Sequence, residues 1–245
     1  MSESLLGGLS DTRTSSEKQA ETELERQAKN KAREIADSGQ TFDYVFGVWQ
    51  KRHHGDAPLG KALFFSLGCQ SISNALGIHV AATGEGGYGK SDGIKKMGQL
   101  IFPTFWKNGG FTPQTLYYSG PDMPDGVVIG LDDVVWGSEL GVTVKRITND
   151  FLEGALRVST VEMKGVEVRT AKRIAFWASC VDSQADEQIR DRFIMYNVKS
   201  DSNRRQEILG HMMARDEGDQ LPEESEFETK VCQVLTYDLR RSCST

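Results

Sequence analysis

Short apolar runs alternate with longer amphipathic or charged stretches along most of the chain. The short runs are typical of strands buried on both faces of a parallel sheet, and the longer stretches between them fit helices. The pattern therefore predicts an α/β protein. We expect buried strands at 78–82, 126–133, 173–180 and 194–198, and helices at 17–36, 59–76, 91–100, 138–155, 203–215 and 227–241.

Two further segments carry strand-forming residues. Residues 111–118 finish on Leu-Tyr-Tyr and are expected to end in a strand. Residues 156–163 and 166–170 alternate β-forming and polar positions on either side of Lys164 and Gly165. A two-residue turn that contains glycine, placed between such runs, predicts a β-hairpin. Its turn would present Lys164 to solvent.

The composition of the chain limits the classes of protein to which it can belong. The chain has 245 residues, of which 38% are hydrophobic and 26% charged, as is ordinary for a globular protein. Its net charge of −6 excludes a compact basic domain for nucleic acid, so any DNA contact must be local. The sequence lacks an apolar run of about 18 residues that would span a membrane. Its polar first residues do not resemble a secretory signal. We expect a cytoplasmic protein with no membrane partner.

These features divide the chain into four parts. Residues 1–16 are polar and are expected to form a disordered tail. Residues 17–58 form a helical N-terminal extension, and residues 59–215 form the α/β core. Residues 216–245 combine an acidic connector with a C-terminal helix.

Cysteine and histidine positions give no support for a metal site. His53 and His54 are adjacent, so they would point to different faces of a helix, and no acid or cysteine close by completes a ligand set. A polar helix end is favoured instead. The four cysteines are widely spaced and indicate reduced thiols of an intracellular protein: Cys69, Cys180, Cys232 and Cys243.

The segment between the first strand and the following helix carries the clearest chemistry. Glycines let the backbone N–H groups of such a loop face a phosphate, and the helix N-terminus adds a favourable dipole. Lys90 would reach the β- and γ-phosphates, and the Ser91 hydroxyl would ligate Mg²⁺. The pattern G-x-x-x-x-G-K-[ST] is matched by Gly84, Glu85, Gly86, Gly87, Tyr88, Gly89, Lys90 and Ser91.

Two acids follow the second predicted strand. Asp132 and Asp133 come directly after an apolar run, about 40 residues beyond Lys90. In a nucleotide-binding α/β sheet the end of such a strand lies beside the phosphate loop, at the carboxyl edge. Asp132 would hold the Mg²⁺ water shell, and Asp133 would orient the attacking water.

The order of these features resembles AAA+ ATPases of the pre-sensor-1 hairpin group. That group includes superfamily 3 helicases, primase-helicases and minichromosome maintenance helicases, and the match spans 59–209. The resemblance implies a phosphate-loop NTPase: a three-layer sandwich with a mainly parallel central sheet and an inserted β-hairpin.

The resemblance also implies roles for individual residues. The segment 84–91 would be the Walker A motif, and Asp132 and Asp133 the Walker B acids. Ser179 would take the sensor-1 position, where Asn is more usual. Arg192 would be the arginine finger that reaches a neighbour's ATP, with Arg190 as its rival, and Lys164 would contact DNA at the hairpin tip.

The resulting expectation is an Mg-ATP-dependent DNA helicase or translocase motor that forms a hexameric ring in replication of a phage, virus or plasmid. Its partners would be single-stranded or forked DNA, other copies of the chain, and a primase or other replication protein. Two alternatives share the phosphate loop: a nucleotide-gated loader or scaffold without unwinding activity, and a small-molecule kinase. A motor needs Lys164 to project into a channel, whereas a loader does not.

Overall fold

The computed structural model describes residues 15–119, 122–161, 164–180, 187–198, 206–207, 210 and 226–241. Residues 1–14 of the predicted 1–16 tail, most of the predicted helix at 203–215, the connector at 216–225 and Cys243 lie outside these residues. The last two residues of that predicted tail already belong to the first helix. Within them, no helix is long and apolar enough to cross a membrane.

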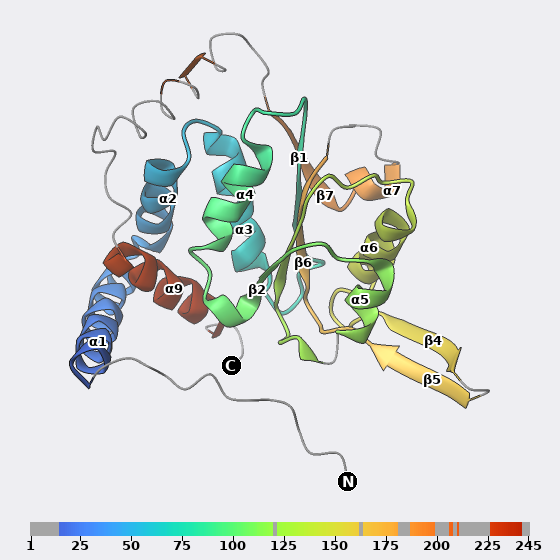
Figure 1. Cartoon of the computed structure of the whole chain (residues 1–245), viewed down its shortest axis with the longest axis horizontal. Coiled ribbons are helices and arrows are strands. Elements are labelled where there is room, and N and C mark those ends of the chain that lie inside the picture. Colours follow the sequence, from blue (N-terminus) through green and yellow to red (C-terminus); the bar gives the residue numbers. More distant parts are fainter. Residues whose placement is uncertain are drawn as a thin grey trace.

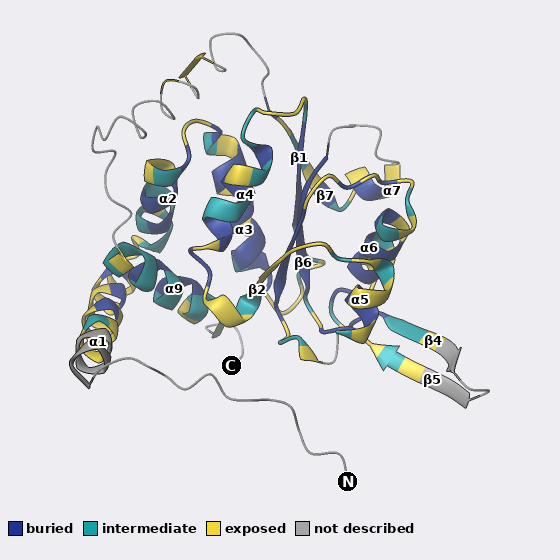
Figure 2. Ribbon diagram, in the orientation of Figure 1, coloured by how far each residue is buried: buried dark blue, intermediate teal, exposed yellow. Residues whose placement is uncertain are grey.

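A five-stranded parallel sheet forms the centre of the molecule (Figure 1). Its strand order is β2-β3-β6-β1-β7, so every neighbouring pair requires a crossover connection. The inner strands are buried along their whole length, as their apolar runs predict (Figure 2). The strands are β1 (His79–Thr83), β2 (Trp106–Asn108), β3 (Val128–Leu131), β6 (Ala175–Ser179) and β7 (Phe193–Asn197).

Helices cover both faces of this sheet, which makes the fold a three-layer α/β sandwich (Figure 1). Alternate residues of one strand serve the two layers: Val80 and Ala82 pack on one side, and Ala81 on the other. One layer holds α1 (Ser15–Asp37), α2 (Thr41–Arg52), α3 (Ala57–Cys69), α4 (Lys90–Gly98) and α9 (Glu226–Arg241). The other holds α5 (Pro113–Tyr118), α6 (Glu139–Asn149) and α7 (Glu187–Arg190).

The N-terminal helix is charged on most of its surface but has a buried seam. Ala28, Ala32 and Ile35 of α1 are almost fully buried and lie at helical spacing. This seam packs against α9, which joins segments from opposite ends of the chain (Figure 1). The small side chains of Ala28 and Ala32 let the two helices approach closely.

The predicted hairpin is present, but its strands pair differently from the prediction. Strands β4 (Leu156–Val161) and β5 (Lys164–Arg169) are antiparallel and stand apart from the central sheet (Figure 1). Lys164 and Gly165 lie inside β5 and pair with Val161 and Thr160, so they do not form the turn. The connection falls at 162–163, which lies outside the described residues.

Further predictions differ from the structure. The strand expected to end 111–118 is wrong: Pro113 starts α5, and the Thr112 side chain caps it by accepting from the Thr115 N–H. The helices expected at 59–76 and 138–155 end earlier, at Cys69 and Asn149. The short edge strand β2 was not predicted, because three residues are too few for a periodic pattern to show.

Candidate nucleotide-binding site

The loop between β1 and α4 has the backbone that its glycines predict. Gly84, Gly87 and Gly89 have φ of +123°, +86° and +83°, a region that side chains with a Cβ rarely adopt. A Cβ on Gly84 would lie 3.0 Å from the Val198 carbonyl oxygen. The first glycine is therefore required by both conformation and space. Glu85, Gly86 and Tyr88 complete the loop, and the Tyr88 ring packs against the core.

Lys90 begins α4 and is directed into this loop. It is 6% exposed, and its ammonium donates to the carbonyl oxygens of Gly84 and, at 2.6 Å, Glu85. These bonds keep a buried positive charge where the loop and the N-terminus of α4 meet. The arrangement suits an anion such as a phosphate group.

Ser179 connects the loop helix to the two predicted acids. The Ser91 hydroxyl donates to Ser179 Oγ at 3.0 Å, and Ser179 Oγ lies 3.4 Å from Asp132 Oδ1. The backbone N–H of Asp133 also donates to Ser179 Oγ, at 3.2 Å. Ser179 is fully buried. The loop serine, the first acid and the predicted sensor-1 residue thus converge at the carboxyl edge of the sheet.

The strand order explains why Ser179 has this position. The sequence places the acids beside the loop, but β3 and β1 are not neighbours, because β6 lies between them. Asp132 therefore meets Ser91 across the end of β6, where Ser179 is the last residue. The short side chain of Ser179 can therefore contact both Ser91 and Asp132.

Lys95 is a component of this site that sequence reasoning missed. Its ammonium lies 2.8 Å from Asp132 Oδ2. Burial alone would raise the pKa of Asp132, but hydrogen bonds from Lys95, Ser91 and Ser179 outweigh it and hold this pKa below its ordinary value. Lys95 lies four residues beyond Ser91, on the same face of α4, and this spacing is the signal that was available.

Asp133 has an unusual backbone. Its φ is +50°, in the left-handed region that few residues other than glycine adopt. Asp and Asn tolerate this region better than most residues. The side chain is exposed. A non-glycine residue in this conformation at the end of a buried strand is a common feature of functional sites.

The oxygen atoms gathered here fit a magnesium ion. Mg²⁺ prefers carboxylate and hydroxyl oxygens and keeps several of its waters. Ser91, Asp132 and Ser179 supply these oxygens, and Asp132 is ionised because its pKa is lowered. Elsewhere among the described residues, no group of three or more His, Cys, Asp and Glu side chains forms a metal site.

His53 departs in part from the sequence prediction. His53 is the C-cap of α2, so the predicted polar helix end is confirmed, but the expectation of no nearby acid is wrong. The residue is 5% exposed, and its ring nitrogens lie 3.1 Å from Asp56 Oδ2 and 3.0 Å from Asp92 Oδ2. Asp92 is close only in the folded protein. Asp56, three residues further along the chain, was available as a signal.

The remaining predicted residues lie away from the loop. Arg192 directly precedes β7, and its carbonyl accepts from the His79 N–H at the start of β1. It therefore lies at the amino edge of the sheet, a strand length of about 15 Å from the loop. Arg190 is the last residue of α7, close to the same edge. Lys164 belongs to the separate hairpin.

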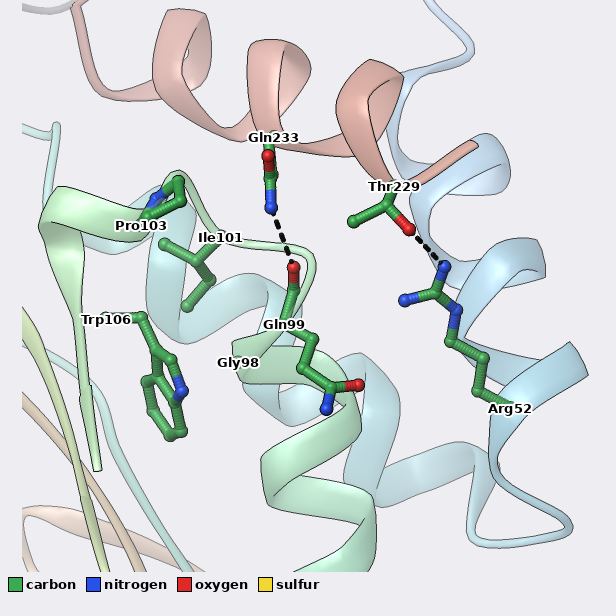
Figure 3. Close-up of a pocket in the computed structure, with 8 residues that line it drawn as sticks. All are labelled: Arg52, Gly98, Gln99, Ile101, Pro103, Trp106, Thr229 and Gln233. Atoms are coloured by element: carbon green, nitrogen blue, oxygen red, sulfur yellow. Dashed lines mark hydrogen bonds between the residues drawn. The ribbon is translucent and has the colours of Figure 1, made fainter. Parts of the chain in front are cut away.

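A groove of about 490 Å³ lies at the other end of α4 (Figure 3). Trp106 lines one side of the groove, and α9 lines the other (Figure 3). Two hydrogen bonds join α9 to its neighbours there: Gln233 donates to the Gln99 carbonyl, and Arg52 donates to the Thr229 hydroxyl. Lys90 and Gly98 are the two ends of the nine-residue α4, so about 12 Å of helix separates the groove from Lys90. The groove is therefore not part of the loop site.

Comparison with known families agrees with this geometry. Residues 23–240 match the family described as the MTBMA_p00010 P-loop domain. The match runs from α1 to α9 and includes the loop, both acids and Ser179. No curated protein matches the chain.

Proposed function

The chain belongs to the MTBMA_p00010 P-loop domain family, and on that premise we propose that it is an Mg-ATP-dependent DNA helicase or translocase motor that works as a ring. The observation that carries the proposal is the convergence of Ser91, Ser179 and Asp132 beside a glycine-rich loop and a buried lysine.

Each residue of the loop site has a distinct part in this function. Lys90 neutralises the β- and γ-phosphates, and the N–H groups at the start of α4 donate to phosphate oxygens. Ser91 and Asp132 bind the magnesium ion, whose charge offsets that of the phosphates. Asp133 orients the attacking water, and Ser179 fixes Asp132 and Asp133 relative to Ser91.

Lys95 would exchange partners when the site fills. Its ammonium neutralises Asp132 in the described structure. A magnesium ion held by Ser91 and Asp132 would supply the same neutralisation, and the Lys95 ammonium could then turn to solvent or to a phosphate oxygen. Because Lys95 and Asp132 are both more than 40% exposed, their ion pair contributes little stability that would resist this exchange.

The position of Arg192 supports action between subunits. At the amino edge of the sheet it cannot reach the loop of its own chain. It can assist hydrolysis only at a neighbour's loop, as an arginine finger does. A ring of identical chains, such as a hexamer, supplies that contact at every interface.

The hairpin supports DNA binding. It stands apart from the sheet, and in chain order it lies between α6 and β6, directly before the strand that ends in Ser179 (Figure 1). We infer that Lys164 contacts DNA phosphates in the channel of the ring, and that the motor serves replication in the cytoplasm, alongside a primase or another replication protein.

Measurement of ATP binding by the purified chain tests whether the loop binds a nucleotide. Lys90→Ala should weaken binding of Mg-ATP by about 30- to 150-fold in calorimetry, because it removes a charged contact worth about 2–3 kcal/mol. Lys107→Ala, an exposed lysine on β2, is the control and should bind as the wild type does. Equal affinity of folded Lys90→Ala and wild type would overturn the loop assignment.

ATPase rates with and without single-stranded DNA test the motor. DNA should stimulate the wild type, and Lys164→Ala should keep the basal rate but lose the stimulation. Lys172→Ala, another exposed lysine beyond β5, should behave as the wild type. A folded, ATP-hydrolysing chain that DNA never stimulates would favour the loader.

A further inference from the structure

His53 is a buried histidine held between two carboxylates from different elements. It follows α2, and its Nε2 lies 3.1 Å from Asp56 at the start of α3, while its Nδ1 lies 3.0 Å from Asp92 in the first turn of α4. The Asp56 side chain is fully buried, and the Asp92 side chain is 55% exposed. An ionised carboxylate only accepts, so with both carboxylates ionised both ring nitrogens donate and the ring carries a positive charge.

The ring also lies against the backbone of the phosphate loop. A Cβ built on Gly89 would lie 3.2 Å from His53 Cε1, and one built on Gly93 would lie 3.1 Å from the same atom. The neighbouring Trp49, one turn earlier on α2, donates from Nε1 to the Gly93 carbonyl at 2.9 Å. The two glycines are therefore needed for the histidine to reach the first turn of α4.

Asp56 extends this contact to the edge strand. Its second carboxylate oxygen accepts from the Tyr196 hydroxyl of β7 at 2.8 Å, and its backbone is left-handed, with φ of 52°. Tyr196 is followed by Asn197 and Val198, which line the other side of the loop at Gly84. His53 thus joins α2, α3, α4 and β7 around the base of the loop.

The charges at this position matter to a bound phosphate. Asp56 and Asp92 place two negative charges beside the N-terminus of α4, where an anion is expected, and His53 offsets one of them. Burial opposes the charged ring, but the hydrogen bonds to Asp56 and Asp92 outweigh it, so the pKa of His53 is raised. Without the imidazolium, both carboxylates would repel the phosphates.

We propose that His53 is a positioning residue for the phosphate loop, which both fixes the first turn of α4 and neutralises the carboxylates that would otherwise weaken nucleotide binding. This role rests on the nucleotide binding proposed above. His53 contacts the loop and not the nucleotide, so its effect is on affinity and not on the chemical step.

A charge-rescue experiment tests this role. The affinity for Mg-ATP is measured by calorimetry at neutral pH and low salt, with thermal unfolding to confirm folding. His53→Gln removes the charge and should weaken binding about tenfold. Asp92→Asn keeps an acceptor for the histidine and removes a repelling charge, so it should bind equally or up to about threefold more tightly. The control is His54→Gln, half-exposed, which should match the wild type.

The double variant His53→Gln/Asp92→Asn separates charge from packing. If His53 acts by neutralisation, the double variant should recover most of the affinity that His53→Gln loses. A double variant no tighter than His53→Gln, or a His53→Gln protein within twofold of the wild type, would overturn the proposal.

Two further outcomes remain decisive. If His53→Gln does not fold, Asp92→Asn alone decides: weakening of about tenfold overturns the proposal, and equal or tighter binding supports it. Failure of the proposed function looks different, because the wild type and Lys90→Ala would then bind Mg-ATP equally. That result would overturn the nucleotide site and the role of His53 with it.

Discussion

Among the described residues, one buried histidine lies at each edge of the sheet, and the two have opposite surroundings. At the carboxyl edge His53 lies between two carboxylates, which raise its pKa. At the amino edge His79 begins β1 among aromatic rings, and burial, followed by the charge of Arg192, lowers its pKa to about 3. The carboxyl edge is built to retain charges near a phosphate, whereas the core at the amino edge excludes them.

The amino edge nevertheless has one predicted catalytic contribution, through Arg192. Arg192→Ala should bind ATP and assemble but lose turnover by about a thousandfold or more, because an arginine finger supplies rate enhancement of that order. Steady-state ATPase assays at several protein concentrations measure this. Mixing the Arg192→Ala protein with the Lys90→Ala protein should restore activity. Some interfaces then join the intact loop of one variant to the intact arginine of the other.

Arg190→Ala in the same mixing assay decides which of the two arginines acts. A chain that stays monomeric with ATP and DNA, and whose specific activity does not change with concentration, would rule out action between subunits. The two edges would then have independent functions.

His79 should make the protein sensitive to acid. Its folded pKa is lowered from 6.5 to about 3, so the unfolded chain binds a proton in that range and the folded chain does not. Stability is therefore present above pH 6.5 and is lost as the pH falls toward 3. At about 1.36 kcal/mol per pKa unit the loss is up to about 5 kcal/mol.

Chemical denaturation at pH 7 and pH 4 checks this loss. His79→Gln can still accept from the Phe176 N–H, and its free energy of unfolding should fall much less between the two pH values. Identical pH dependence in the variant and the wild type would show that carboxylates alone cause acid sensitivity.

Features set by a local segment could be predicted from the sequence, whereas features set by the order of the strands could not. The short apolar runs predicted the three inner strands, because a strand buried on both faces is apolar along its whole length. The loop motif predicted a turn that depends on glycine, and three of its glycines have positive φ, because the conformation of such a loop is set by its own residues. Ser179 was placed through a resemblance, and its contacts with Ser91 and Asp132 depend on β6 lying between β1 and β3.

Contacts that join distant segments could not be predicted. Asp92 meets His53 across 39 residues, and Lys95 meets Asp132 across a helix and two strands. Neither pair has a spacing that a single sequence reveals, although the spacing of Lys95 from Ser91 indicates that both lie on the same face of α4. The missed helix at Pro113 is a different case, since proline after a capping threonine was a local signal outweighed by two tyrosines.

Substitution of Asp132 and Asp133 tests the chemistry proposed at the carboxyl edge of the sheet. Asp133→Asn should still bind Mg-ATP but hydrolyse it roughly a hundredfold more slowly, because it loses the group that orients water. Asn also tolerates the left-handed backbone at this position, so the fold should persist. Asp132→Asn should instead weaken Mg²⁺-dependent binding. Single-turnover rates and calorimetry distinguish the two, and near wild-type rates in both would make the strand end structural only.

The smallest expected effect is an alkaline loss of stability caused by His53. Its folded pKa lies above the unfolded value of 6.5, so the folded state keeps a proton that the unfolded state has released. The stabilisation is complete below pH 6.5 and is lost as the pH rises through the folded pKa, in the opposite direction to that of His79. His53→Gln should flatten this alkaline decline in denaturation experiments, whereas His54→Gln should retain it. If the His53→Gln protein declines as steeply as the wild type, the two carboxylates do not hold a charged ring, and the contrast between the two edges fails at its carboxyl side.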